Sequence, residues 1–363
     1  MQKTKINLIV LISTIIILLI ILEIFLRIFF PISDNLFIGD KIIGHKHIPD
    51  KKAKYLSEEY KTISLFNSEG FRDINHEIEN QNKTRIAFLG DSFTDALEVN
   101  FENSFHQILK KDLNKNYPNN YEIFNFGMWY FSTAQEYLLY KEYVKKYSPD
   151  IIYLQVFYND PYETCLPNSQ NPSYYLENNQ IKAREFIPLK TGKLKLFISK
   201  YSKLAVLIRK TYKDFQAKTS QQELTQQEGI QKEKKVYLEN YDKETLDCFY
   251  LSEYFLKKLK QEIENDNAEL RVIIISHPAS IYEKDKQEFL ENTELDEEIS
   301  FDKPEKQFEN ILNKLGIKYI STKQEFKNQR KRVYFEKDKH LNEKGHEILG
   351  KMLYENLINK KAF

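Results

Sequence analysis

The sequence contains only two cysteines in 363 residues, and neither lies in a CxxC motif or near histidines at the spacing of a zinc site. This scarcity argues against a zinc-binding module and against a small fold held by a disulfide framework. Two interpretations of Cys165 and Cys248 stay open. They form a single bridge if the domain folds outside the cytoplasm, or they are two unrelated buried thiols.

An excess of charge is also missing, because 54 basic residues balance 53 acidic ones and leave a net charge of +1. This balance of charge suggests neither a nucleic-acid surface nor a strongly anionic partner. It also lacks a glycine-rich phosphate loop and an acidic metal cluster, so we expect neither a cofactor nor a metal. With 41% hydrophobic residues, the chain has the composition of an ordinary globular protein with a sizeable core.

A long apolar run is present at the N-terminus. No charge occurs from Asn7 to Leu22, and the run continues to Phe30, broken only by Glu23 and Arg27. Roughly 20 such residues cross a bilayer as a helix. The run is longer than the core of a signal peptide and is not followed by an A-x-A-like cleavage site. We therefore predict an uncleaved anchor, with residues 1–30 as cytoplasmic tail and transmembrane helix. The flanking lysines and arginines barely decide its orientation.

Beyond the anchor, the pattern divides the chain into three further parts. Residues 31–83 are polar and rich in turn residues, which predicts a stalk and a short lead-in. Residues 84–160 and 244–363 alternate strands with helices, as in an α/β domain with a parallel sheet. Residues 161–243 interrupt this alternation and predict a largely helical insertion, with a helix over 194–212 and a polar tract over 216–235. The expected strands are 85–89, 121–126, 151–157, 270–276 and 317–320.

Ser92 is the first candidate for a catalytic residue, as a nucleophile. It lies in Gly90-Asp91-Ser92-Phe93-Thr94, directly after the first predicted strand. A sharp strand-to-helix turn exposes a serine hydroxyl at the edge where open α/β sheets bind ligands. Alone the tripeptide is weak, since a serine that caps a helix is more common.

The end of the chain supplies a base for that serine. Serine needs a proton acceptor to become a nucleophile, and this is usually a histidine held by a carboxylate. Asp338 and His340 stand in a loop before the last predicted helix. Glu336 is another carboxylate within reach, and Glu343 with His346 fits better as the start of the final helix.

Two further turn residues are candidates for stabilising an oxyanion. The tetrahedral intermediate of acyl transfer needs fixed N–H donors. Gly127 follows the second strand and offers its backbone N–H, and Asn159 follows the third strand and offers its side-chain amide. Because parallel strands end at the same edge, these groups and Ser92 are expected to lie close together.

In order and context, Ser92, Gly127, Asn159 and His340 resemble the four sequence blocks of the SGNH (GDSL-like) hydrolases. The segment Asn67–Arg72, together with the motifs around 132–135 and 148–150, is similar to membrane-anchored bacterial members. The resemblance covers roughly 67–160 and 270 to the C-terminus. It implies a three-layer α/β/α, flavodoxin-like fold and a metal-free Ser92–His340–Asp338 triad. The implied oxyanion hole consists of Ser92 N–H, Gly127 N–H and the Asn159 amide.

The chain departs from the family pattern in three places, one of which is Asp95-Ala96-Leu97 after the serine, where glycine- and aromatic-rich residues are common. The aspartate usually stands three residues before the histidine, where this chain has Lys337, whereas Asp338 stands two before it. A glycine commonly precedes the Asn-Asp pair by two residues, and here that position is Phe157.

The resemblance implies a serine esterase or O-acyltransferase that acts on acyl, chiefly acetyl, esters of envelope carbohydrate or a lipid-linked substrate. The anchored types imply a catalytic domain in the periplasm or outside the cell, attached to the cytoplasmic membrane by residues 7–30. The alternative is a catalytically degenerate SGNH domain that acts as an envelope assembly or binding module. Hydrolysis or transfer, the acyl group and the oligomeric state are not encoded in a recognisable motif.

Overall fold

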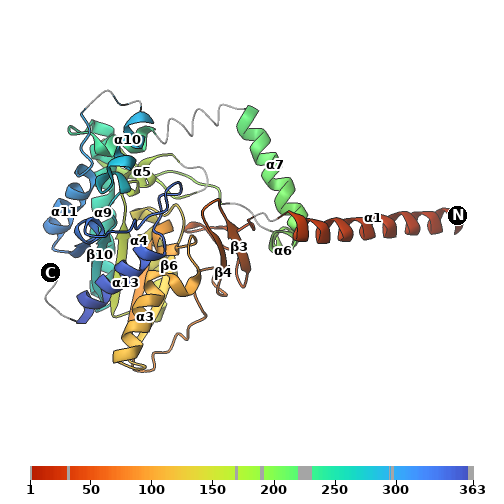
Figure 1. Cartoon of the computed structure of the whole chain (residues 1–363), viewed down its shortest axis with the longest axis horizontal. Coiled ribbons are helices and arrows are strands. Elements are labelled where there is room, and N and C mark those ends of the chain that lie inside the picture. Colours follow the sequence, from red (N-terminus) through yellow and green to blue (C-terminus); the bar gives the residue numbers. More distant parts are fainter. Residues whose placement is uncertain are drawn as a thin grey trace.

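The computed structural model describes residues 2–30, 33–167, 171–188, 192–219, 231–293, 295 and 298–358. Five strands form a parallel sheet at the centre of the main domain (Figure 1). They are β5 (Thr84–Gly90), β6 (Tyr121–Gly127), β7 (Ile151–Val156), β10 (Glu269–Ile274) and β11 (Lys318–Ser321). Their order is β11-β10-β7-β5-β6, and each neighbouring pair is parallel. This is the flavodoxin-like order, which places its switch point between β5 and β7. The five predicted strands are all present.

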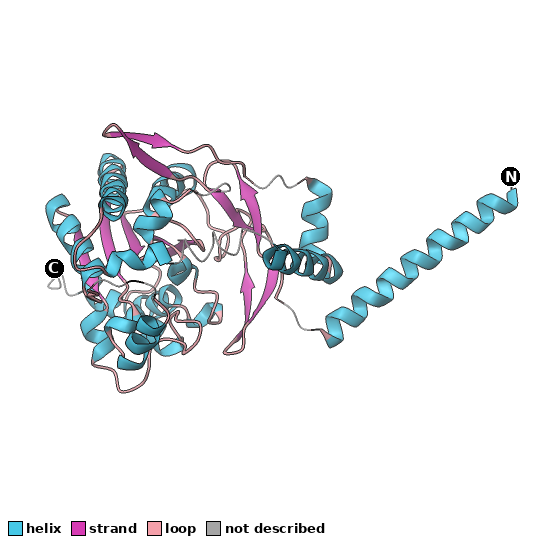
Figure 2. Cartoon of the chain, turned by 90° about the horizontal axis from the view of Figure 1, so that it is seen from above, coloured by secondary structure: helices cyan, strands magenta, loops and turns pink. Residues whose placement is uncertain are grey.

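Helices cover both faces of the sheet (Figures 1 and 2). Leu89 and Leu154 pack on one side with α4 (Thr133–Leu139), α9 (Lys243–Asn265) and α11 (Lys303–Leu315). Phe88 and Tyr153 pack on the other side with α3 (Phe105–Asn116), α12 (Lys323–Lys327) and α13 (Glu343–Ile358). Successive residues face opposite layers because of the pleat. The predicted three-layer α/β/α fold is therefore confirmed.

Short helical elements complete the main domain. A π-helical turn (Tyr140–Val144) and a 3₁₀ turn (Lys145–Tyr147) extend α4, and α10 (Glu283–Glu291) follows β10. Three further 3₁₀ turns cover Phe101–Asn103, Lys234–Tyr237 and Pro278–Ser280.

The segment predicted as stalk and lead-in contains two antiparallel hairpins that the sequence analysis missed. The first pairs β1 (Phe37–Asp40) with β2 (Gly44–His47), and the second pairs β3 (Lys52–Leu56) with β4 (Lys61–Leu65). In β4 the polar Thr62 and Ser64 are buried, whereas Ile63 and Leu65 are exposed. This strand therefore reverses the usual relation between hydrophobicity and burial, and the pattern gave no strand signal.

The insertion begins with α5 (Asp160–Cys165) and a hairpin of β8 (Tyr174–Glu177) and β9 (Gln180–Ala183), which was not predicted. The helix expected over 194–212 is present as two helices, α6 (Lys193–Tyr201) and α7 (Lys203–Thr219), which are separated at Ser202. Most of the polar tract predicted over 216–235 lies outside the described residues. Cys165 of α5 and Cys248 of α9 form a disulfide, with 5.3 Å between their Cα atoms, so the two cysteines are a bridge.

The N-terminal helix α1 (Gln2–Phe29) projects away from the folded domain (Figure 1). Its segment Thr4–Phe29 is long and apolar enough to cross a membrane, and most of its apolar side chains are exposed. A signal sequence near an N-terminus can meet the same criteria of length and composition, so the uncleaved anchor stays a prediction.

Candidate active site

Ser92 lies in a tight turn between β5 and the short helix α2 (Ser92–Asp95). The turn requires glycine at position 90, where φ is +155° and a Cβ atom would lie 2.3 Å from Thr94 Oγ1. Asp91 then caps α2, because its Oδ1 accepts a 2.8 Å hydrogen bond from the N–H of Phe93. The local sequence thus presents the Ser92 hydroxyl at the carboxyl end of a central strand.

Ser92, His340 and Asp338 are joined by two short hydrogen bonds. Nε2 of His340 lies 2.7 Å from Ser92 Oγ, and Nδ1 of His340 lies 2.6 Å from Asp338 Oδ1. The ring of Trp129 is parallel to the imidazole, with 6.0 Å between the ring centroids. A carboxylate on Nδ1 leaves Nε2 as the nitrogen that receives a proton from the serine.

The two-residue spacing between Asp338 and His340 works because of the backbone between them. Lys339 has a φ of +68°, so the loop turns sharply and the two side chains face one another. The Lys339 ammonium forms ion pairs of 2.7 Å with Asp285 and with Glu288.

The other carboxylate and histidine candidates lie elsewhere. Glu336 is exposed and pairs with Lys284 at 3.2 Å. His346 is buried in α13, where its Nδ1 accepts a hydrogen bond from the N–H of Phe105. Glu343 accepts a hydrogen bond from Asn103. Of the carboxylates weighed from the sequence, Asp338 is the one that contacts His340.

A second carboxylate, which the sequence analysis missed, also approaches His340. Oε1 of Glu98 lies 3.8 Å from His340 Nδ1, Glu98 is 1% exposed, and its side-chain oxygens have no hydrogen-bond partner among the described residues. Burial raises the pKa of Glu98 to about 7. Burial also acts to lower the pKa of His340, but the charges of Glu98 and Asp338 outweigh it and raise that pKa to about 9.

The missed hairpins and the lead-in hold the site from outside the α/β domain. Tyr60 donates a 2.7 Å hydrogen bond to Asp338 Oδ2, and Glu59 accepts 2.8 Å and 2.9 Å bonds from the N–H groups of Asp338 and Lys337. The buried guanidinium of Arg72 donates to carbonyl oxygens of the loop after Ser92, including those of Asp95 (3.0 Å) and Val99 (2.6 Å). Tyr60 therefore positions Asp338, and Arg72 positions the loop that follows Ser92.

A cavity of about 440 Å³ opens over the serine. Asn159 lines it, and the Asn159 amide nitrogen donates one 2.8 Å hydrogen bond to Glu163, which leaves its second hydrogen. The remaining residues around the cavity are Asp91, Ser92, Phe93, Trp129, Tyr130, Phe157, Tyr158, Glu163, His277, Asp338, Lys339 and His340.

The structure does not place Gly127 as expected for an oxyanion donor. Its N–H donates a 2.9 Å hydrogen bond to Asn125 Oδ1, and Gly127 does not line the cavity. A glycine is needed there because a Cβ atom would lie 2.2 Å from the backbone nitrogen of Asp95. Gly127 thus allows α2 to approach β6, and its amide is already occupied.

Tyr130 is a backbone donor that the sequence analysis missed. It lines the cavity with φ at +60°, and its N–H has no acceptor among the described residues. A left-handed conformation at tyrosine is uncommon and is a feature of functional loops. No glycine marks the position, so the sequence carried no signal for it.

Three buried carboxyl groups lie behind the serine. Burial raises the pKa of Asp91 to about 6, against the lowering effects of the Phe93 N–H and of the charge of His340. Burial also raises the pKa of Glu136 and Asp160, and the negative charge of Asp91 raises both further. Glu136 and Asp160 therefore favour their neutral, protonated forms, which lowers the cost of burying them.

One group in the described part of the chain has the ligand geometry of a metal site, and it belongs to the same site. Ligand atoms of Glu98, Asp338 and His340 lie within 4.8 Å of one another. A metal on His340 Nδ1 would displace the proton that Asp338 accepts. The hydrogen-bonded arrangement and a metal at this position are therefore alternatives.

No protein-family model matches the chain, and no curated protein matches it. Solved structures do match. The acetyl xylan esterase AlAXEase is 12% identical, with 76% of this chain and 100% of that chain covered and a TM-score of 0.41. A catalytic mutant of the acetylxylan esterase Axe2 from Geobacillus stearothermophilus is 13% identical (76% and 94% covered, TM-score 0.42). TesA is 9% identical (76% and 98% covered, TM-score 0.41).

At these identities and TM-scores, the activities of those proteins are not thereby those of this chain. The chain's own topology shows where the predicted site residues lie. Ser92, Gly127 and Asn159 follow or end the neighbouring strands β5, β6 and β7, and His340 reaches Ser92 from the loop before α13. The three-layer α/β/α fold with flavodoxin-like strand order, which the resemblance implied, is thus the fold of this chain.

Proposed function

We propose that this chain is an SGNH-type serine esterase or O-acyltransferase. The observation that carries the proposal is the continuous hydrogen-bond chain from Ser92 Oγ through His340 to Asp338, at 2.7 Å and 2.6 Å. This arrangement supplies a nucleophile, a base and a carboxylate that orients the base, at the ligand-binding edge of a parallel sheet.

In the proposed reaction, neutral His340 accepts the proton of Ser92 through Nε2 while the serine oxygen attacks the acyl carbon. A tetrahedral intermediate forms, and the imidazolium then returns the proton to the departing alkoxide. The resulting acyl-enzyme is attacked by water or by a hydroxyl acceptor, which His340 deprotonates in turn. The bond between the acyl carbon and Ser92 Oγ then breaks, and the imidazolium returns the proton to Ser92. Asp338 stabilises the imidazolium at each stage.

The oxyanion requires fixed donors close to Ser92. We assign this role to the N–H of Ser92 and the side-chain amide of Asn159, and we replace Gly127 by the backbone N–H of Tyr130. The left-handed conformation of Tyr130 and its place in the cavity support this change.

The substrate that fits the proposal is an acyl ester of a carbohydrate or of a lipid-linked molecule, with acetyl as the expected acyl group. Aromatic residues at the cavity, among them Trp129, Tyr130 and Tyr158, offer flat surfaces of the kind that pack against sugar rings. The cavity volume of about 440 Å³ is within the usual range for small-molecule sites.

We further propose that α1 anchors the enzyme in the cytoplasmic membrane, with the catalytic domain outside the cytoplasm. The length and exposed apolar surface of α1 support the anchor. The Cys165–Cys248 disulfide supports an oxidising compartment, because such bonds are rare in the cytoplasm.

Labelling with a fluorophosphonate probe tests the proposal directly. We expect the detergent-solubilised full chain to be labelled and to hydrolyse p-nitrophenyl acetate, and we expect Ser92→Ala to abolish both. A folded chain that is neither labelled nor active would instead favour an assembly or binding module. Adding a sugar acceptor and following acetyl transfer by mass spectrometry separates transfer from hydrolysis.

A further inference from the structure

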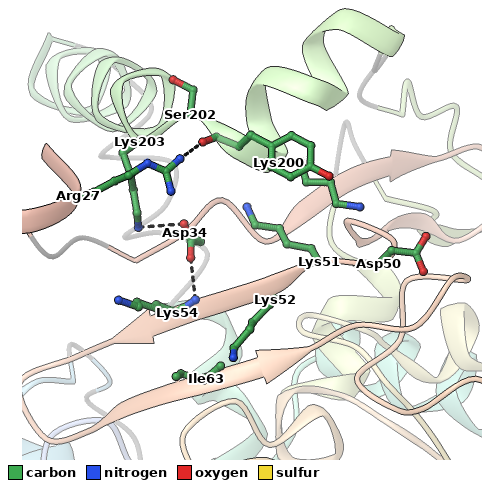
Figure 3. Close-up of a pocket in the computed structure, with 11 residues that line it drawn as sticks. Arg27, Asp34, Asp50, Lys51, Lys52, Lys54, Ile63, Lys200, Ser202 and Lys203 are labelled. Carbon is green, nitrogen blue, oxygen red and sulfur yellow. Dashed lines mark hydrogen bonds and ion pairs between the residues drawn. The ribbon is translucent and has the colours of Figure 1, made fainter. Parts of the chain in front are cut away.

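A basic pocket lies where α1 meets the folded domain (Figure 3). It shares no lining residue with the cavity over Ser92. Its volume is about 470 Å³. It is lined by Arg27, Asp34, Asp50, Lys51, Lys52, Lys54, Ile63, Lys200, Tyr201, Ser202 and Lys203. Six of these side chains are cationic and two are carboxylates, so the pocket has a strong excess of positive charge.

Carboxylates among the described residues pair with some of these cations. Lys203 pairs with Asp34 at 2.9 Å, and Arg27 pairs with Glu23 at 2.8 Å. The exposed ammonium groups of Lys52 and Lys54 have no carboxylate partner in the described part of the chain. Lys200 donates to the carbonyl oxygen of Pro49, which carries no formal charge.

One lysine of the pocket is buried. Lys51 is 3% exposed, and its burial lowers its pKa to about 8, with further lowering by the charges of Lys203 and Lys200 against the opposing effect of Asp34. A pocket that makes protonation of a lysine costly is one that an anion would stabilise.

The pocket is held at the end of α1 by specific contacts. Glu23 accepts hydrogen bonds from the N–H groups of Lys203 (2.8 Å) and Leu204 (3.0 Å), and so caps the start of α7. Arg27, one turn later, donates to the carbonyl oxygen of Tyr201 at the end of α6. The last turns of α1 therefore fix both helices of the insertion beside the cationic side chains.

An apolar surface adjoins the charges. Leu194, Phe197 and Tyr201 of α6 are exposed by 73%, 62% and 52%, and Phe29 and Phe30 lie exposed at the end of α1. Apolar and aromatic side chains next to lysines are typical of segments that lie at the boundary between acyl chains and headgroups.

We infer that this pocket binds the phosphate of an anionic phospholipid headgroup in the leaflet at the carboxyl end of α1. Lysine ammonium groups are compact cations suited to phosphate, and basic clusters beside a membrane helix bind anionic lipids. The adjoining apolar side chains favour a lipid over free phosphate, because the acyl chains then cover α6. This inference rests on the proposed insertion of α1 and is independent of the esterase chemistry.

The same β3–β4 hairpin links the pocket to the catalytic site. Lys52 and Lys54 lie on β3, and Tyr60, which bonds Asp338, lies in the turn before β4. A headgroup held by the lysines would thus fix the orientation of the domain over the membrane, with the catalytic cavity beyond the far end of the hairpin.

The test uses the full chain in nanodiscs of phosphatidylcholine alone or with added phosphatidylglycerol. Acetylation of lysines by a water-soluble reagent is followed by peptide mass spectrometry. We expect phosphatidylglycerol to slow acetylation of Lys52 and Lys54 severalfold and to leave Lys61, an exposed lysine on the same hairpin outside the pocket, unchanged.

Native mass spectrometry with a short-chain phosphatidylglycerol measures affinity. We expect Lys52→Gln with Lys54→Gln to weaken binding by about fivefold for each lysine removed. The control joins Lys61→Gln with Lys111→Gln, since Lys111 is an exposed lysine of α3 outside the pocket, and it should have no effect. Equal protection by both disc types, or equal loss in both double variants, would overturn the inference. Inorganic phosphate that binds as tightly as the lipid would show an anion site without a membrane role.

A chain recovered outside both kinds of disc would contradict insertion of α1, and the inference with it. Fluorophosphonate labelling reports separately on the esterase proposal.

Discussion

The hydroxyl of Tyr60 donates a 2.7 Å hydrogen bond to Oδ2 of Asp338, a residue 278 positions later in the chain. The other oxygen of the same carboxylate contacts His340. A hairpin in a segment that the sequence suggests is a stalk thus completes the support of the proposed triad. The bond orients Asp338 and stabilises its negative charge, since phenol-to-carboxylate hydrogen bonds are among the stronger ones.

We expect Tyr60→Phe to lower kcat/KM about tenfold, because a hydrogen bond to a charged group contributes about 1.5 kcal/mol or more. Tyr140→Phe is the matched control. It removes a 2.9 Å bond of the same kind, to Asp266, in a core distant from Ser92 in the fold. Steady-state ester hydrolysis measures both variants. Equal losses in the two would mean that Tyr60 acts through general stability.

His340 accepts a proton only when neutral, and its pKa is raised to about 9 by Glu98 and Asp338 against the effect of burial. The reaction of Ser92 with a fluorophosphonate should therefore be slow at neutral pH and should accelerate as pH rises toward 9. Glu98→Gln removes the largest contribution that raises this pKa, so the rise in rate should move to lower pH.

Glu136→Gln is the control for Glu98→Gln. Glu136 is likewise buried with both carboxylate oxygens unpaired among the described residues, but its electrostatic partners are Asp91 and Glu163. The pH dependence of labelling should keep its wild-type midpoint in this variant. A profile for Glu98→Gln that coincides with wild type would remove Glu98 from the account of His340.

Asp338→Asn should lower turnover by about 10³–10⁴-fold, because an amide in this place no longer stabilises the imidazolium or the required tautomer. Glu336→Gln should leave turnover near wild type, since Glu336 is exposed and its side chain pairs with Lys284 rather than with His340. Burst and steady-state kinetics with p-nitrophenyl acetate compare the two. The reverse ranking would show that the wrong carboxylate has been assigned.

Asn159→Ala should lower kcat by about 10²–10³-fold with a smaller change in KM, as expected for loss of an oxyanion donor. Glu163→Gln keeps a hydrogen-bond partner for Asn159 and should retain most activity. Similar kcat values for Asn159→Ala and wild type would exclude Asn159 from the oxyanion hole.

Replacing Cys165 and Cys248 together by serine should lower the free energy of unfolding by about 2–4 kcal/mol, because the bridge closes a loop with a sequence separation of 83 residues. Urea denaturation of the oxidised protein, with and without a reducing agent, measures this. The reducing agent should destabilise the wild-type chain and leave the double variant unchanged.

The sequence by itself determined the α/β core and the position of the serine. Strands such as β5 are continuous apolar runs buried on both faces, so their signal depends only on local composition. Ser92 follows such a strand, and all carboxyl ends of a parallel sheet meet at one edge. The spacing of Asp338 and His340 is likewise local, and the left-handed Lys339 between them brings their side chains together.

Only the tertiary structure decided what surrounds these residues. Thr62 and Ser64 of β4 face inward while Ile63 and Leu65 face out, so no local pattern marks the hairpin that carries Tyr60. The approach of Glu98 to His340 joins residues 242 apart in number, and the occupation of Gly127 N–H by Asn125 depends on side-chain packing. Contacts of this kind follow from how the layers dock, because the free energy of burial is shared among many residues rather than encoded at any one position.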